Sequence, residues 1–252
     1  MNGFVTIAGA GPGDIDHLTV GVLREIQSAQ VILYDALLSQ SIIAEFPHDA
    51  TTIYVGKRCG NHTYTQTMII AAMIEHAMAG RRVLRLKGGD PSVFAHLASE
   101  IAALEALDIS YRILPGVSAM HAAAAELKRP LTLRQDSRHI WATDGHAADL
   151  ERHMPAMAAF TGTLIFYMAA GRTAQIAELL IAHGMQADTP AALVENAGTA
   201  TAVNHSGNLA DFATGRLCRS TSGAGIFLTG VALATRTEED TQSVNHASAP
   251  QL

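Results

Sequence analysis

Arg85-Leu86-Lys87-Gly88-Gly89-Asp90-Pro91 is the stretch around which the chain is organised. A hydrophobic strand pattern at residues 83–86 runs straight into it, and a helix pattern begins near Ser92. Paired glycines allow positive φ and let a ligand lie against bare backbone, and an aspartate can accept hydrogen bonds from ribose hydroxyls or an ammonium group. Open α/β sheets bind ligands at the carboxyl ends of their strands. The turn by itself fits a ligand-binding loop and an ordinary β–α connection equally well.

Strand and helix patterns alternate along the whole chain, which predicts an α/β fold. Short apolar runs predict strands at residues 4–8, 31–34, 52–55, 83–86, 111–114, 139–143, 164–168, 192–195 and 226–231. Apolar residues at helical spacing predict helices at residues 19–29, 68–79, 97–104, 122–127 and 176–183. No internal repeat is evident.

A change in character near residues 115–130 predicts two α/β lobes with a ligand site in the cleft between them. We expect an N-terminal lobe at residues 1–117 and a C-terminal lobe at residues 118–234. Residues 235–252 are polar and without pattern, which predicts a disordered tail.

The composition, 48% hydrophobic and 16% charged residues, is ordinary for a globular protein. Apolar stretches end well before the ~18 residues that span a bilayer, and residues 1–9 lack the basic start of a signal peptide. The two cysteines, Cys59 and Cys218, fit neither a metal spacing nor a disulfide framework, and no HExxH or HxH pattern occurs among the histidines. These features predict a cytoplasmic protein without a metal ion.

The charge distribution indicates which kinds of partner the protein could bind. A net charge of −6 argues against nucleic acid or an anionic membrane. Of 17 basic residues only three are lysines, Lys57, Lys87 and Lys128. Arginine suits bidentate pairing with carboxylates, so a local arginine cluster could bind a polyacidic small ligand. Arginines that serve only as ordinary surface charges would give the same excess of arginine over lysine.

Two further strand ends carry candidate site residues. The turn at residues 9–14 superficially fits the dinucleotide fingerprint, but Asp14 occupies the third glycine position and Pro12 lies inside the turn, which excludes it. Asp35 ends the second strand. It fits a site residue facing the cleft and a helix N-cap about equally well.

Seven short motifs occur in a characteristic order: Gly9-Ala10-Gly11-Pro12-Gly13-Asp14, Tyr34-Asp35, Val55-Gly56-Lys57-Arg58, Leu86-Lys87-Gly88-Gly89-Asp90-Pro91, Pro115-Gly116, Phe166-Tyr167-Met168 and Val194-Glu195-Asn196. Together they resemble the tetrapyrrole methylases that use S-adenosylmethionine, over about residues 3–233. Each motif alone is weak, whereas their ordered co-occurrence is specific. Residues 34–39 and 54–58 are most similar to family members that methylate uroporphyrinogen III.

The resemblance implies a homodimer of two-lobed chains that bind S-adenosylmethionine in the cleft rather than on a Rossmann turn. The residues that would line this cofactor are Pro12, Gly88, Gly89, Asp90, Val93, Ser118, Ala119, Met168, Ala197 and Gly225. No metal is implied.

The resemblance also implies methylation of two pyrrole carbons of uroporphyrinogen III, giving precorrin-2 for sirohaem or cobalamin synthesis. Asp35 is then the candidate base and Lys57 the candidate acid, although Lys57 fits a clamp on substrate carboxylates equally well. The residues expected to contact the substrate are Arg58, His62, His96, Glu100 and Arg134.

The chain departs from the family pattern in segments expected to meet the tetrapyrrole. Where relatives usually read Gly-Arg-Gly-Gly-Glu-Glu, residues 95–100 read Ala-His-Leu-Ala-Ser-Glu. Asn61 and Leu133 replace a usual arginine and histidine. The chain therefore fits an active methyltransferase with a modified carboxylate pocket, an enzyme that methylates a different tetrapyrrole, or a non-catalytic protein that binds S-adenosylmethionine or a tetrapyrrole.

Overall fold

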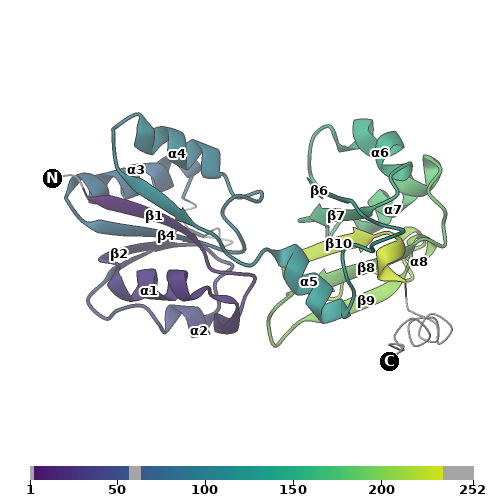
Figure 1. Ribbon diagram of the computed structural model, residues 1–252, viewed down its shortest axis with the longest axis horizontal. Coiled ribbons are helices and arrows are strands. Elements are labelled where there is room, and N and C mark those ends of the chain that lie inside the picture. The colour runs from purple at the N-terminus through teal and green to yellow at the C-terminus, as the bar shows by residue number, and fades with distance from the viewer. Residues whose placement is uncertain (1–2, 57–63, 235–252) are drawn as a thin grey trace, which may run out of the picture. The chain divides into compact units, whose positions relative to one another are not determined.

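The computed structural model describes residues 3–56 and 64–234 (Figure 1). By its internal contacts the chain divides into two compact units. Unit 1 comprises Met1–Leu127, Val194–Val203 and Thr221–Ile226, and unit 2 comprises Lys128–Leu193, Asn204–Ser220 and Phe227–Leu252. The predicted lobe boundary at residues 117 and 118 stays a prediction, and the predicted tail lies outside the described residues.

Unit 1 contains a five-stranded sheet with the order β3-β2-β4-β1-β5. Its strands are β1 (Phe4–Gly9), β2 (Val31–Tyr34), β3 (Thr51–Tyr54), β4 (Arg82–Lys87) and β5 (Tyr111–Leu114). All four pairings are parallel, with Ile7 opposite Arg85 and Gly9 opposite Lys87. The carboxyl ends of the strands, and the loops that follow them, therefore lie along one edge.

Helices cover both faces of this sheet (Figure 1). One apolar layer contains strand residues such as Val5 and Leu33 packed with Met73 of α3 (Gln66–Met78) and Leu104 of α4 (Leu97–Glu105). The opposite layer packs strand residues against α1 (Val20–Ser28) and α2 (Gln40–Ile43). Strands buried on both faces read as continuous apolar runs, which is why the sequence located them well. Helix α5 (Ala119–Leu127) also belongs to unit 1.

The second sheet has the order β6-β7-β10-β8-β9. Its strands are β6 (Ile140–Asp144), β7 (Thr163–Tyr167), β8 (Pro190–Glu195), β9 (Val203–Asn208) and β10 (Gly225–Thr229). Strand β6 pairs parallel with β7, whereas β10 runs antiparallel to β7. The helices α6 (Leu150–Ala158), α7 (Thr173–Ala182) and α8 (Leu209–Ala213) contribute to one apolar core with this sheet. The predicted α/β class with two sheets is confirmed.

Two short 3₁₀ turns, η1 (Ile15–His17) and η2 (Val231–Leu233), complete the described elements. One predicted boundary is wrong. The helix after the Gly-Gly turn begins at Leu97 and not near Ser92. Phe94 and His96 have φ of 50° and 55°, in the left-handed region, so a right-handed helix cannot run through them.

Candidate functional site

Two glycine turns meet at the carboxyl edge of the unit 1 sheet. The N–H of Gly89 donates to the carbonyl of Gly11 at 2.7 Å, and the N–H of Gly11 donates to the carbonyl of Gly89 at 3.2 Å. Both residues have positive φ, 74° at Gly11 and 69° at Gly89, which glycine adopts without steric strain. The turn after β1 and the turn after β4 therefore form one rigid backbone surface.

The neighbouring glycines are required by close packing. A Cβ atom on Gly9 would lie 2.5 Å from the carbonyl oxygen of Gly89, and one on Gly116 would lie 2.3 Å from the same oxygen. By contrast, a Cβ on Gly89 would meet nothing within 4 Å among the described residues. The backbone of Gly89 thus has an open face, as a ligand lying against bare peptide needs.

Asp90 ties this turn to the loop after β5. Its Oδ2 accepts from the N–H of Gly116 at 3.0 Å, and its Oδ1 accepts from the N–H of Ser92 at 2.8 Å and from the Ser92 hydroxyl. Burial alone would raise the pKa of Asp90, but these hydrogen bonds outweigh it and hold the pKa below its ordinary value. The carboxylate is therefore charged and fixed, with acceptor capacity left for a ligand.

Asp35 lies beside the same turn. Its Oδ1 accepts from the N–H of Leu37 at 3.1 Å and its Oδ2 from the N–H of Gly88 at 3.3 Å. The cap of the following helix α2 is Ser39, whose hydroxyl accepts from the N–H of Ile42. Of the two readings left open by the sequence, the N-cap is wrong, and Asp35 is in contact with the Gly-Gly turn.

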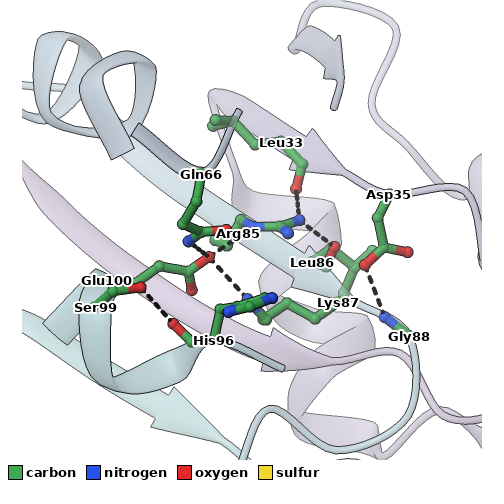
Figure 2. A network of polar contacts seen from close by, with 10 residues as sticks. All are labelled: Leu33, Asp35, Gln66, Arg85, Leu86, Lys87, Gly88, His96, Ser99 and Glu100. Atoms are coloured by element: carbon green, nitrogen blue, oxygen red, sulfur yellow. Dashed lines mark hydrogen bonds and ion pairs between the residues drawn. The ribbon is translucent and has the colours of Figure 1, made fainter. Parts of the chain in front are cut away.

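A buried cluster of charges includes Lys87, the residue before Gly88 (Figure 2). Oε1 of Glu100 accepts from the Lys87 ammonium at 2.7 Å, from Nε of Arg85 at 3.3 Å and from the Gln66 amide at 3.2 Å. Arg85, Lys87 and Glu100 are 4%, 3% and 0% exposed. Neither Arg85 nor Gln66 is among the site residues predicted from the sequence. Side chains two positions apart lie on the same face of a strand, so Arg85 and Lys87 share one face of β4. This spacing is the feature of the sequence from which their proximity could have been predicted.

The predicted substrate contacts His96 and Glu100 lie in different surroundings. The burial of Glu100 argues against a direct contact with a substrate, because its carboxylate has no exposed surface. His96 is exposed at the start of α4, and its carbonyl accepts from the Ser99 hydroxyl at 2.9 Å. A substrate contact by His96 stays a prediction.

The remaining predicted cofactor residues divide between the units. Most belong to unit 1, where the carbonyl of Gly198, next to Ala197, accepts from the N–H of Asp14 at 3.1 Å. Met168 belongs to unit 2 and is 49% exposed, with φ of 56°. The unit 1 residues are Pro12, Val93, Ser118, Ala119, Ala197 and Gly225, besides the Gly-Gly-Asp turn itself. Their contact with a cofactor stays a prediction.

Lys57, Arg58 and His62 lie outside the described residues. Arg134, in unit 2, lines a cavity of about 700 Å³ together with Thr132, Leu133 and Arg138. Nε of Arg138 donates to the carbonyl of Arg134 at 2.6 Å, which holds the two arginines together. Sequence reasoning missed Arg138, four residues after Arg134 in the same basic segment.

Within residues 3–56 and 64–234, no group of three His, Cys, Asp or Glu side chains could hold a metal ion. In the same part of the chain, no helix combines the length and apolar character needed to cross a membrane.

A doubly wound parallel sheet with glycine turns at its carboxyl edge, joined to a second mixed sheet, defines a two-sheet α/β protein that is not a single Rossmann fold. The comparisons name the family. The model of the tetrapyrrole (corrin/porphyrin) methylases matches residues 5–213, and the chain belongs to this family.

One curated protein and one solved structure support this membership. Siroheme synthase of Edwardsiella ictaluri is 42% identical over 198 residues, which cover 78% of this chain and 43% of that protein. The chain thus spans less than half the length of the curated relatives it matches. A uroporphyrin-III C-methyl transferase from Thermus thermophilus, complexed with S-adenyl homocysteine, is 30% identical with a TM-score of 0.78, over 92% of this chain and 99% of that one.

A third relative shows how widely the fold is shared. The cobalt precorrin-4 methyltransferase CbiF has a TM-score of 0.80 at 24% identity, over 92% of this chain and 96% of that one. At this identity the likeness concerns the fold alone.

Proposed function

We propose that this chain transfers methyl groups from S-adenosylmethionine to two pyrrole carbons of uroporphyrinogen III, giving precorrin-2. The family membership and the likeness to a uroporphyrin-III C-methyl transferase support this activity. The observation that carries it is the paired turn of Gly11 and Gly89, whose open backbone face supports binding of a ligand such as the S-adenyl homocysteine in the complex of that relative.

The residues of unit 1 fit the binding of S-adenosylmethionine. The Gly88–Gly89 backbone offers N–H and carbonyl groups without side-chain obstruction, and the fixed Asp90 carboxylate can accept from ribose hydroxyls or the ammonium group. When bound, the cofactor supplies a methyl group on a sulfonium, whose sulfur keeps the electron pair of the broken C–S bond.

The chain's contribution to the reaction is positioning and proton removal. An electron-rich pyrrole carbon forms the new C–C bond, so accurate placement of the two reactants is the main contribution that the protein can make to this step. The methylated ring then loses a proton to a base, and we assign Asp35 to this role. Its position against Gly88, where the cofactor would lie, supports the assignment.

Substrate carboxylates would be bound by arginines through charge-assisted hydrogen bonds. Arg134 and Arg138 at the unit 2 cavity fit this role. From the resemblance, Arg58 and His62 are further contacts and Lys57 is an acid or a carboxylate clamp. We further propose that the protein acts in the cytoplasm as a homodimer, with the tetrapyrrole as its partner rather than nucleic acid or a membrane.

The test incubates purified protein with uroporphyrinogen III and S-adenosylmethionine under anaerobic conditions and follows product mass and absorbance. We expect a gain of two methyl groups, and an Asp35→Asn variant that binds S-adenosylhomocysteine but transfers little. Binding of S-adenosylhomocysteine by calorimetry without any mass gain would overturn the proposal. Methylation of another tetrapyrrole alone would instead assign a different substrate, as the departures at residues 95–100 allow.

A further inference from the structure

Leu37 is an exposed leucine in the loop after β2, at the carboxyl edge of the unit 1 sheet. The residue is 57% exposed. Single exposed leucines are common on protein surfaces, so exposure alone assigns no role to this one. Leu37 differs from such residues in the way that the neighbouring backbone fixes its position next to the candidate site.

The loop that carries Leu37 packs against the glycines that follow the two neighbouring strands. The sheet order places β2 between β3 and β4. On the β4 side, a Cβ atom on Gly88 would lie 2.6 Å from Cβ and 2.9 Å from Cδ1 of Leu37. On the β3 side, a Cβ atom on Gly56 would lie 2.5 Å from the backbone nitrogen of Ala36. Glycine at both positions therefore allows the loop to come this close to its neighbours.

Asp35 fixes the same loop through both of its carboxylate oxygens. Oδ1 accepts from the N–H of Leu37 at 3.1 Å, and Oδ2 accepts from the N–H of Gly88 at 3.3 Å. One carboxylate thus joins the backbone of Leu37 to the Gly-Gly turn, and the leucine side chain lies on Gly88 itself. A substrate atom placed between Asp35 and a cofactor on the Gly-Gly turn would therefore lie next to this leucine.

We propose that Leu37 is a substrate contact that packs against the pyrrole ring undergoing methylation and sets its position relative to the cofactor and to Asp35. The inference rests on the proposed function. A pyrrole ring has a flat apolar face, and packing it against an exposed leucine removes apolar surface of both from water. Charge-assisted hydrogen bonds can bind the carboxylates of the substrate, whereas the ring itself needs an apolar contact.

The test measures steady-state kinetics with uroporphyrinogen III for wild type, Leu37→Ala, Leu37→Asn and Leu37→Met. The first variant shortens the side chain, and the second keeps its branched shape but makes it polar. We expect kcat/KM to fall at least tenfold in both. Part of the loss should appear in kcat, because a misplaced ring reacts more slowly. Leu37→Met keeps an apolar side chain of similar size and should stay within about threefold of wild type.

Two further measurements separate a substrate contact from a structural or a cofactor-binding role. Because Leu37 is exposed, the Tm of each variant should stay within about 3 °C of wild type. The Kd for S-adenosylhomocysteine should stay within about threefold. Leu107→Ala is the matched control, since Leu107 is 46% exposed and precedes β5, at the amino edge of the parallel sheet. It should show wild-type kinetics.

The outcomes distinguish this inference from the proposed function. Values of kcat/KM within about threefold of an active wild type in both Leu37→Ala and Leu37→Asn would overturn this inference alone. A rise in the Kd for S-adenosylhomocysteine that accounts for the whole loss would also overturn it alone, because Leu37 would then act on the cofactor. Absence of methyl transfer by wild type would overturn the proposed function and this inference with it.

Discussion

Two basic regions of the molecule differ in how they hold their charge. In unit 1, Arg85 and Lys87 are buried and share the carboxylate of Glu100. In unit 2, Arg134 and Arg138 are exposed at a cavity, and Nε of Arg138 donates to the backbone carbonyl of Arg134. A buried charge lowers the stability of the protein unless a partner of opposite charge compensates its lost solvation. An exposed charge stays solvated by water and can bind a ligand. Substitutions in the first region should therefore change stability and geometry, and those in the second should change affinity.

The strongest test of this contrast is Glu100→Gln. It leaves Lys87 and Arg85 buried without a carboxylate, which should lower the free energy of unfolding by roughly 3 kcal/mol. Urea unfolding of wild type and variant measures the difference. Glu151→Gln, at an exposed position of α6, is the control and should stay within about 0.5 kcal/mol. A loss below about 1 kcal/mol for Glu100→Gln would remove the distinction between the regions.

Asp90→Ala should act mainly on cofactor binding. It removes the acceptor that holds the N–H groups of Gly116 and Ser92, each a charge-assisted hydrogen bond. A loss of about 3 kcal/mol corresponds to more than a hundredfold increase in the Kd for S-adenosylhomocysteine. Titration calorimetry measures this Kd, with Asp16→Ala, at an exposed position of η1, as the control. An unchanged Kd would exclude the Gly-Gly-Asp turn as the cofactor site.

The same carboxylate predicts a pH dependence of binding. Because hydrogen bonds hold the pKa of Asp90 below its ordinary value, its stabilising contribution is fully present above the unfolded value of about 3.9. It is lost only as the pH falls through the lower, folded value. The contribution of Asp90 to the binding of S-adenosylhomocysteine should therefore be constant from about pH 5 to 8. This contribution should decline below about pH 4. A decline centred near neutral pH would require another group.

Arg134→Ala and Arg138→Ala test the exposed region. Each would remove one of the proposed arginine–carboxylate contacts, worth about 1.5–3 kcal/mol, which should raise KM for the tetrapyrrole about tenfold or more. Since the lost binding is uniform, kcat should change little. Steady-state kinetics measure both, with Arg152→Ala, exposed on α6, as the control. A drop in stability as large as that of Glu100→Gln would contradict the contrast between the two regions.

The smallest expected effect concerns His96, which carries a side chain at φ of 55°. His96→Gly should raise the free energy of unfolding by about 0.5–1 kcal/mol, because glycine adopts this conformation without strain and is tolerated at a helix N-cap. Ala95→Gly, at a residue without positive φ, should lower it instead. Denaturant unfolding of the pair separates the two cases. Equal changes in both variants would show that backbone strain at His96 is negligible.

The sequence predicted the buried strands well because each is an apolar run bounded by turn residues. Strand β9 was missed because Val203–Asn208 is polar and lies at the edge of its sheet, where alternation is weak. Helix α6 was also missed, since it carries Pro155 in its interior and makes no side-chain N-cap hydrogen bond.

The candidate site was predictable where backbone conformation dictates residue type. Gly11 and Gly89 stand out because both have positive φ, which glycine adopts without strain, and because a Cβ on Gly11 would lie 2.8 Å from the carbonyl oxygen of His17. The ion cluster was not predictable, because a charged helix residue such as Glu100 is normally expected on the protein surface. Its burial becomes evident only when the neighbouring strand is known. Its burial depends on contacts between residues 13 and 34 positions apart along the chain.

The burial of Lys87 has a practical consequence for following motion in unit 1. Reagents that acylate amines reach exposed Lys128 directly, whereas they reach Lys87 only after the contacts around Glu100 separate. The rate at which label accumulates on the peptide containing Lys87, relative to that containing Lys128, therefore measures how often the carboxyl edge of β4 opens. Labelling of Lys87 thus reports opening of this edge, and labelling of Lys128 in the same chain serves as the internal standard.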